Sequence, residues 1–288
     1  MARRLPGPRV ELVSVDSMQV YRGMDIGTAK ATAAERDEVP HHLLDLVDPD
    51  ESFSVARFQA AAADALADIE DRGARALLVG GTGLYLRAVV DGLTVPGTWP
   101  EVRAGLEGEA DTSALHRRLT ELDPVAAGRM TAENRRRVVR ALEVTLGSGR
   151  PFSSFGPGLD RHPPTRFRLA GVWLPRPVVA ERILARVEAM VAAGLVAEVA
   201  GLAARPHGLS DTAAQALGYR EMLGHLAGET SLSEAAEMTV GRTRSFSRRQ
   251  RMWFRRDPRI SWYGTAENPF ALLPALLGEW SSPWPTPQ

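Results

Sequence analysis

Cysteine is absent from this sequence of 288 residues, and its absence excludes disulfide bonds and thiolate metal sites. The sequence also contains no run of about 18 apolar residues, so it predicts no membrane-spanning helix. The first seven residues include two arginines but no long apolar stretch, so we expect no signal peptide. These absences predict a cytoplasmic protein without a membrane partner.

Lysine is nearly absent as well, because Lys30 is the only one among 35 basic residues. A Walker phosphate loop needs a lysine directly after a glycine and directly before serine or threonine. Lys30 follows an alanine, three positions beyond Gly27, so the sequence contains no such loop. The formal net charge is +0, so any affinity for nucleic acid must come from where the arginines lie.

The sequence does contain an alternation of short apolar strands and longer helices. Val10–Val15 predicts a strand, and the apolar run Ala76–Val79 is suited to a buried one. Helices are predicted at 54–72, before the second strand, and at 84–90, after it. This alternation predicts an α/β fold with a parallel sheet and helices on both faces. Later segments predict two further strands and three long helices: 167–174 and 260–263, then 178–204, 212–227 and 232–256. Ser231 and Glu234 have the spacing of a capping box that begins the last of these helices, and the tail, 283–288, is expected to be frayed.

Two regions depart from this alternation. Residues 17–50 are punctuated by glycine and proline and are expected to be irregular. Residues 96–162 are polar and helical and predict an inserted subdomain. We therefore divide the chain into a first part of the core at 1–95, a helical insertion at 96–162 and a second part of the core at 163–288.

Polar side chains directly follow the first two predicted strands. Asp16 follows Val15, and Thr82 lies in the glycine-rich stretch Gly80–Gly83. Ligands of parallel α/β folds bind beyond the carboxyl ends of the strands, so Asp16 and Thr82 could face one cleft. Asp16 could act as a general base, or it could form a turn at the end of its strand. The glycine-rich stretch could bind phosphate through backbone N–H groups, or it could be a tight turn.

Arginines gather in the insertion and in the last long helix. The insertion has a cluster that could contact phosphates or form a solvated face paired with Glu143: Arg135, Arg136, Arg137 and Arg140. Residues 242–256 contain seven arginines and no acidic residue. Helical spacing places four of these on one face: Arg244, Arg248, Arg251 and Arg255. Phe246 and Trp253 fall opposite, where they can pack on the core. A basic stripe without acidic partners favours binding of nucleic acid or phosphate.

Six stretches occur in the order typical of one family: Ser14–Lys30, Pro40–Asp45, Val79–Tyr85, Arg140–Val144, Ala216–Arg220 and Arg248–Arg255. The first, SVDSMQVYRGMDIGTAK, is the most specific. With this set the sequence resembles the tRNA dimethylallyltransferase family over residues 10–263. The resemblance implies a P-loop-kinase-like core and a helical insertion that grips the anticodon stem-loop of tRNA.

The resemblance also implies the substrates. Dimethylallyl diphosphate would supply a prenyl group to the N6 amine of an adenine next to the anticodon, with Mg²⁺ as cofactor. The adenine would leave the stack, because its amine cannot be reached within a stacked loop. The ligands of the metal stay unassigned. His41 and His42 lack the spacing of a metal site and are expected to have a structural or surface role.

Individual positions match functional residues of that family. Asp16 matches the catalytic aspartate, which receives a hydrogen from the amine. Thr82 and Arg220 match residues near the reacting centre and the diphosphate, where an arginine offsets developing charge. The residues that match those holding the flipped base are Ser17, Met18 and Gln19. The residues that match tRNA-contacting segments are Arg136, Arg137, Arg140, Gln215, Gly218, Tyr219, Arg248, Arg249, Gln250, Arg251 and Arg255.

One feature of the family is not found in this sequence, namely an N-terminal strand followed by a Gly-x-Thr-x-x-Gly-Lys-Ser/Thr loop that cradles the diphosphate. The strand at Val10 is preceded by only nine residues. We therefore expect about twenty residues of a strand–loop–helix unit to be missing upstream. A misassigned start codon or a degenerate gene copy would explain this. We expect the chain alone to be unstable and nearly inactive.

Three functions stay open on this evidence. A tRNA-modifying enzyme accounts for both the insertion and the basic helix. An adenylate prenyltransferase that acts on free nucleotide would need neither of them. A tRNA-binding remnant without catalysis fits the missing loop, although Asp16, Thr82 and Arg220 are retained. We expect a monomer.

Overall fold

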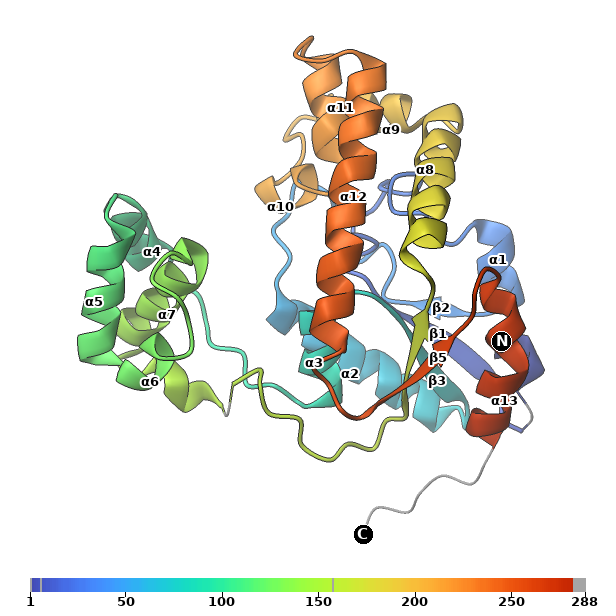
Figure 1. Ribbon diagram of the computed structural model, residues 1–288, viewed down its shortest axis with the longest axis horizontal. Coiled ribbons are helices and arrows are strands. Elements are labelled where there is room, and N and C mark those ends of the chain that lie inside the picture. The colour runs from blue at the N-terminus through green and yellow to red at the C-terminus, as the bar shows by residue number, and fades with distance from the viewer. Residues whose placement is uncertain (1, 6, 157, 282–288) are drawn as a thin grey trace. The chain divides into compact units, whose positions relative to one another are not determined.

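The computed structural model describes residues 2–5, 7–156 and 158–281, and the chain divides into two units (Figure 1). The first unit combines Met1–Val90 with Thr165–Gln288, and the second consists of Asp91–Pro164. Each unit has a hydrophobic core of its own. Within the described residues, no helix is both long and apolar enough to cross a bilayer.

A three-stranded parallel sheet lies at the centre of the first unit. β1 (Val10–Val15) lies between β2 (His41–His42) and β3 (Arg75–Gly80). β1 is almost fully buried and pairs with β3 over its whole length, in parallel. The parallel sheet that the sequence predicts is therefore confirmed, and the carboxyl ends of β1 and β3 lie side by side.

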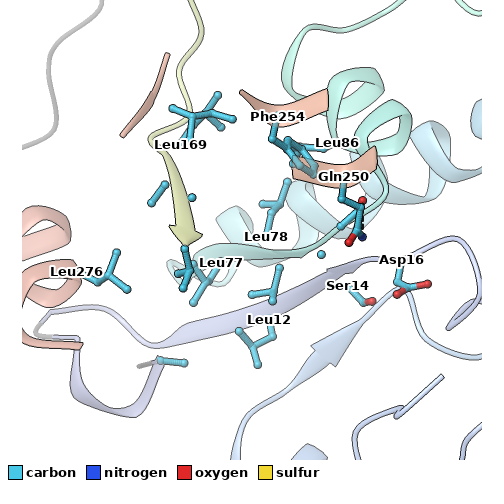
Figure 2. Close-up of a pocket in the computed structure, with 18 of the residues that line it drawn as sticks. Leu12, Ser14, Asp16, Leu77, Leu78, Leu86, Leu169, Gln250, Phe254 and Leu276 are labelled. Atoms are coloured by element: carbon cyan, nitrogen blue, oxygen red, sulfur yellow. Dashed lines mark hydrogen bonds between the residues drawn. The ribbon is translucent and has the colours of Figure 1, made fainter. Parts of the chain in front are cut away.

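A second parallel sheet is formed by β4 (Leu169–Trp173) and β5 (Ile260–Gly264). Among the described strands, no backbone pairing joins it to the first sheet. A cavity of about 1760 Å³ is lined by β3, by β4 and by α12 (Leu232–Phe254) (Figure 2). The prediction of a buried strand at Ala76–Val79 is wrong, because no residue of β3 is buried and Val79 is 54% exposed. The residues of β3 line the cavity instead.

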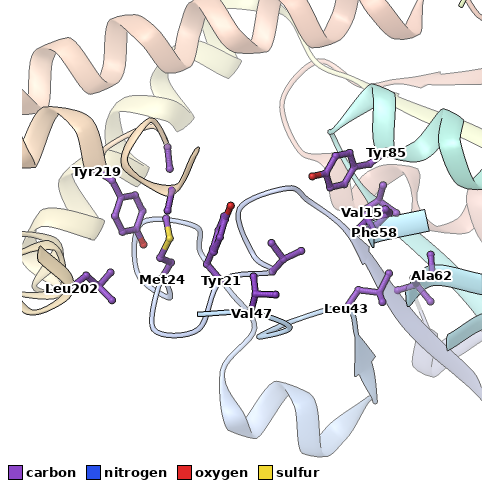
Figure 3. Close-up of a cluster of buried hydrophobic side chains, with 14 of the residues drawn as sticks. Val15, Tyr21, Met24, Leu43, Val47, Phe58, Ala62, Tyr85, Leu202 and Tyr219 are labelled. Atoms are coloured by element: carbon purple, nitrogen blue, oxygen red, sulfur yellow. The ribbon is translucent and has the colours of Figure 1, made fainter. Parts of the chain in front are cut away.

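Helices pack against the first sheet and complete its core. α2 (Val55–Asp71) begins where the sequence predicts, because the Ser54 hydroxyl accepts a hydrogen bond from the Arg57 amide. α3 (Gly83–Val90) follows β3. The ring centres of Phe58 on α2 and Tyr85 on α3 lie 4.4 Å apart. Figure 3 shows the aromatic and aliphatic side chains of this core. Its largest fully buried side chains are Tyr21, Tyr219, Phe58, Met24 and Ile69.

Two of the predicted long helices are each divided at a glycine. The observed segments are α8 (Arg176–Ala192), α9 (Leu195–Ala203), α10 (Asp211–Ala214) and α11 (Tyr219–Leu226). Gly194, with φ +100°, separates the first two, and Gly218, with φ +90°, precedes α11. A positive φ ends a right-handed helix, and glycine adopts it without a steric penalty.

The remaining predictions of secondary structure have mixed outcomes. α12 begins at the predicted capping box of Ser231 and Glu234. The region expected to be irregular contains β2 and a short helix, α1 (Ala33–Glu38). Three short elements lie nearer the two ends of the chain: η1 (Ala2–Arg4), η3 (Pro269–Leu272) and α13 (Leu273–Ser281). Residues 283–288, expected to be frayed, lie outside the described residues.

The second unit contains only helical elements among its described residues. They are α4 (Pro100–Glu107), α5 (Thr112–Leu122), α6 (Pro124–Ala127), α7 (Arg135–Ser148) and η2 (Phe152–Phe155). Leu119, Val138 and Leu142 are fully buried in its core. The buried Glu143 ties the start of the unit to α7, because its carboxylate accepts hydrogen bonds from the Trp99 amide and from Arg103.

Candidate active site

Asp16 and Thr82 meet where β1 and β3 end. The Ser17 amide donates to Thr82 Oγ1 at 3.1 Å, and the Thr82 amide donates to the Val15 carbonyl at 3.4 Å. Thr82 thus contacts the residues on either side of Asp16. The two strand ends are adjacent, as the prediction of one cleft requires, but of the two side chains only Asp16 lines the cavity.

Asp16 is held through one of its two carboxylate oxygens. Oδ1 accepts a hydrogen bond from the Met18 amide at 2.8 Å, whereas no described protein group donates to Oδ2. The side chain is half-buried and lines the large cavity (Figure 2). Burial raises the pKa of the neighbouring Tyr85 to about 12, with the charges of Tyr21 and Asp16 adding to the effect. Asp16 therefore presents one carboxylate oxygen that is available to accept a proton.

Gln19 is fixed at both ends of its side-chain amide. Its Oε1 accepts from the Ser14 hydroxyl at 2.7 Å, and its Nε2 donates to the Thr28 carbonyl at 3.1 Å. These bonds set the orientation of the amide. Gln19 lines the same cavity as Asp16, and Ser17 and Met18 between them are half-buried.

The loop that carries Gln19 is held by a residue that the sequence did not single out. Glu198 on α9 accepts hydrogen bonds from three consecutive backbone amides, at residues 25–27, and from the Tyr219 hydroxyl. Tyr219 is fully buried, and burial together with the hydrogen bond to Glu198 raises its pKa. A carboxylate more than 170 residues away along the chain gives no local signal, so sequence reasoning could not find it.

Lys30 is a second structural residue of this loop. Its side chain is fully buried, and Nζ donates to Asp25 at 2.6 Å, to Asp45 at 2.7 Å and to the Tyr21 carbonyl. Burial alone would raise the pKa of Asp45, but hydrogen bonds from Lys30 and Arg36 lower it below its usual range. The only lysine of the sequence lies between Asp25 and Asp45, and this position was the one indication in the sequence that Lys30 could be structural.

The basic face of α12 lines the cavity that contains Asp16. Its members there are Arg244, Arg248, Arg251 and Arg255. Arg248, Arg249 and Arg255 are exposed, and no described acidic residue pairs with any of them. The guanidinium of Arg251 lies 5.0 Å from the ring centre of Trp173, which is a cation–π contact. The structure thus brings a carboxylate and several cationic groups to one cavity.

The opposite face of α12 is only partly as predicted. Trp253 is half-buried, as expected. Phe246 is 37% exposed, and its ring centre lies 6.0 Å from the guanidinium of Arg249. The prediction that Phe246 packs on the core is therefore wrong. Gln250 is also half-buried, and its Nε2 donates to the Gly81 carbonyl at 3.0 Å.

The segment before α11 separates into buried and exposed residues. Tyr219 and Gly218 are buried, and the Gly218 amide donates to Glu221 at 2.9 Å. Gln215 and Arg220 are exposed. Gly218 and Tyr219 therefore shape the segment, while the other two side chains reach its surface.

The four clustered arginines of α7 also divide into two pairs. Arg136 and Arg137 are exposed. Arg140 donates to the buried Glu143 at 2.8 Å and to the carbonyls of residues 96 and 97. Arg135 donates to carbonyls at the end of α4 and to the Thr112 hydroxyl. Two of the four arginines are thus committed to the structure of their own unit.

No group of three histidine, aspartate or glutamate side chains converges among the described residues. His42 Nε2 lies 2.6 Å from the carboxylate of Glu11, and His41 Nδ1 lies 2.6 Å from the Val39 carbonyl. Both histidines are thus tied to protein groups, in agreement with the structural one of the two roles expected for them.

Comparisons with known proteins identify the family of this chain. A model of the IPP transferase family matches residues 19–257. The tRNA dimethylallyltransferase of Kineococcus radiotolerans is 52% identical over 255 residues, which cover 88% of this chain and 80% of that protein. The tRNA dimethylallyltransferase of a Nocardioides species is 50% identical over 265 residues, which cover 91% of this chain and 84% of that protein.

Solved structures extend the agreement to the fold. The full-length tRNA isopentenylpyrophosphate transferase of Bacillus halodurans superposes with a TM-score of 0.67 at 38% identity, covering 97% of this chain and 91% of that one. The predicted P-loop-kinase-like fold is thereby confirmed. With the family model matching most of its length and relatives at about half identity, the chain belongs to the IPP transferase family, whose members here are tRNA dimethylallyltransferases.

Proposed function

We propose that this protein transfers a dimethylallyl group from dimethylallyl diphosphate to the N6 amine of an adenine next to the anticodon of tRNA. The observation that carries the proposal is the position of Asp16, whose Oδ2 has no described hydrogen-bond donor and which lines one cavity with the arginines of α12. A base and an anion-binding surface are the two elements that this reaction needs.

In the proposed reaction the adenine nitrogen attacks the first carbon of the prenyl group. The new N–C bond forms as the bond between that carbon and the diphosphate oxygen breaks, and the diphosphate leaves with the electron pair. The proton lost by the amine passes to the carboxylate of Asp16. An exocyclic amine of adenine is a weak nucleophile, so a base at this point lowers the barrier.

The basic residues fall into two proposed roles. Arg251, beside Trp173 in the cavity, offsets charge on the leaving diphosphate, and Arg220 and Thr82 are proposed to assist it. The exposed arginines contact the phosphates of tRNA: Arg136, Arg137, Arg248, Arg249 and Arg255. The exposed Gln215 is proposed to join them. Ser17 to Gln19 are proposed to hold the flipped adenine.

Mg²⁺ is proposed as a companion of the diphosphate. The described residues do not build a metal site by themselves, because no three acidic or histidine side chains converge. Magnesium commonly retains waters and binds substrate phosphates with one or two carboxylates. We therefore assign no catalytic step to the metal.

The test is prenyl transfer from labelled dimethylallyl diphosphate to an anticodon stem-loop RNA, with wild-type protein and Asp16→Asn. The substituted asparagine would keep the shape of the side chain but lose the base, so we expect turnover to fall by at least about 100-fold while RNA affinity is unchanged. Equal turnover in the two proteins would exclude Asp16 as the base. AMP serves as the competing substrate, since transfer to AMP would indicate an adenylate prenyltransferase. RNA binding without transfer by the wild type would indicate a non-catalytic tRNA-binding protein.

A further inference from the structure

The basic helix α12 touches the glycine-rich loop that carries Thr82. Gln250 donates from Nε2 to the carbonyl of Gly81 at 3.0 Å. Figure 2 shows the Gln250 side chain at the cavity. Trp253, less than one turn further on, lies against Gly83. A Cβ atom added at Gly81 would lie 2.2 Å from Gln250 Nε2, and one added at Gly83 would lie 2.2 Å from Trp253 Nε1. The two glycines therefore allow a close approach, and a side chain at either position would force Gln250 or Trp253 to move.

The same loop touches the backbone around Asp16. Thr82 lies between the two glycines, and its hydroxyl accepts a hydrogen bond from the Ser17 amide while its own amide donates to Val15. A continuous series of contacts thus joins Gln250 to the residues on either side of Asp16. All of these residues belong to the first unit.

A loop of this composition depends on contacts from outside. Only Gly81 and Thr82 lie between β3 and α3, and glycine has more backbone freedom than any other residue. The loop therefore gains order from whatever holds its carbonyls and covers its backbone. On its α12 side, the hydrogen bond from Gln250 is the polar contact, and the indole of Trp253 is the apolar one.

We propose that Gln250 is a positioning residue for the reaction. It holds the Gly81 carbonyl, and through Thr82 and Ser17 it keeps the carboxylate of Asp16 in a fixed place relative to the basic helix. The side-chain amide serves the loop rather than RNA, although Gln250 lies between two arginines proposed for RNA and diphosphate. This inference rests on the proposed function, in which α12 binds the RNA and Asp16 acts on it.

The test compares Gln250→Met with a matched control, Gln59→Met. Methionine has a similar length, no charge and no N–H donor, so it removes the hydrogen bond without adding repulsion to the RNA surface. Gln59 makes the same type of bond, from Nε2 to the Ala88 carbonyl at 2.8 Å, near the end of α3 and not at the Gly81 carbonyl. Three quantities are measured: hydrogen exchange of segments 14–19 and 79–86, affinity for the anticodon stem-loop, and the rate of a single turnover at saturating RNA.

For Gln250→Met we expect exchange in both segments to rise about tenfold, and the single-turnover rate to fall about tenfold, as for loss of one hydrogen bond. RNA affinity should stay within about twofold, since no phosphate contact is lost. Gln59→Met should leave all three quantities at their wild-type values.

Two results would overturn the inference. Unchanged exchange in both segments would show that Gln250 does not hold the loop. Weaker RNA binding with a normal rate at saturating RNA would show that it contacts the RNA directly. If the wild type transfers no prenyl group, the proposed function fails, and hydrogen exchange together with RNA affinity still decides the role of Gln250.

Discussion

The two arginine clusters of this protein look alike in the sequence and differ in the structure. In α7, Arg135 and Arg140 point to carbonyls and to the buried Glu143, so they hold their own unit together. In α12, Arg248 and Arg255 are exposed and have no described acidic partner. The number of basic residues in a run therefore does not show how many of them can bind a ligand. That number depends on which side chains already donate to acceptors within the protein.

The largest effect that we expect from this comparison is on stability, at Arg140. Arg140→Ala removes three hydrogen bonds and leaves the buried Glu143 with fewer donors. The free energy of unfolding should therefore fall by about 2 kcal/mol. Denaturant unfolding measures this. Arg136→Ala is the control, since an exposed arginine should change the free energy by less than about 0.5 kcal/mol. Equal stability of the two variants would contradict the assignment of Arg140 to a structural role and of Arg136 to the surface.

A somewhat smaller effect is expected on RNA binding, at Arg248. Arg248→Ala should weaken binding of the anticodon stem-loop about tenfold and reduce the dependence of log affinity on log salt by about one phosphate contact. Affinity titrations at several salt concentrations measure both quantities. An unchanged salt dependence would place Arg248 away from the RNA.

Each exposed arginine of the insertion should contribute less to RNA binding than Arg248 does. We expect Arg136→Ala to weaken RNA binding about threefold, because one exposed phosphate contact is lost and its neighbour Arg137 remains. Arg140→Ala, assayed under conditions where it is folded, should bind RNA within about twofold of the wild type. If Arg140→Ala weakened binding more than Arg136→Ala, its guanidinium would have to be reassigned to the RNA.

A separate effect on stability concerns a third kind of arginine, one that pairs with a buried carboxylate at the other end of β1. A hydrogen bond from Arg72 lowers the pKa of Glu11 below its usual 4.5, and His42 contributes in the same direction. A lowered pKa means that this stabilisation is present above pH 4.5 and is lost as the pH falls through the pKa of the folded protein.

We expect Glu11→Gln to lose about 1 kcal/mol at neutral pH and to have a flatter dependence of stability on pH below about 5. The free energy of unfolding between pH 7 and pH 3 measures both. A wild type and a variant with parallel pH curves would contradict the assignment to Glu11.

The elements that could be predicted are those fixed by local chemistry. Val10–Val15 forms its strand as expected, because β-branched residues favour extended backbone. Ser54 and the pair Ser231–Glu234 begin their helices as expected, since their side chains accept from backbone amides nearby. The positions of Asp16 and Thr82 followed from the rule that parallel strands end at a common edge.

The elements that could not be predicted depend on contacts distant in sequence. Gly218 has φ +90° and lies beside Leu195 and Thr239. A glycine within a helical sequence pattern does not by itself predict that the helix ends there. Glu198 reaches back to the amides of residues 25–27 from α9. The commitment of Arg140 to the carbonyls at 96 and 97 requires the fold of the insertion.

The absence of cysteine, together with the complete burial of Lys30, leaves the side chains of this protein almost inert toward thiol- and amine-reactive labels. A single cysteine placed at an exposed position would therefore carry a fluorophore at one known site. Leu84, which is 40% exposed and adjoins Gly83, is a suitable position. A dye attached to Leu84→Cys would report directly, in an otherwise unlabelled chain, whether the loop beside Asp16 changes its surroundings when RNA binds.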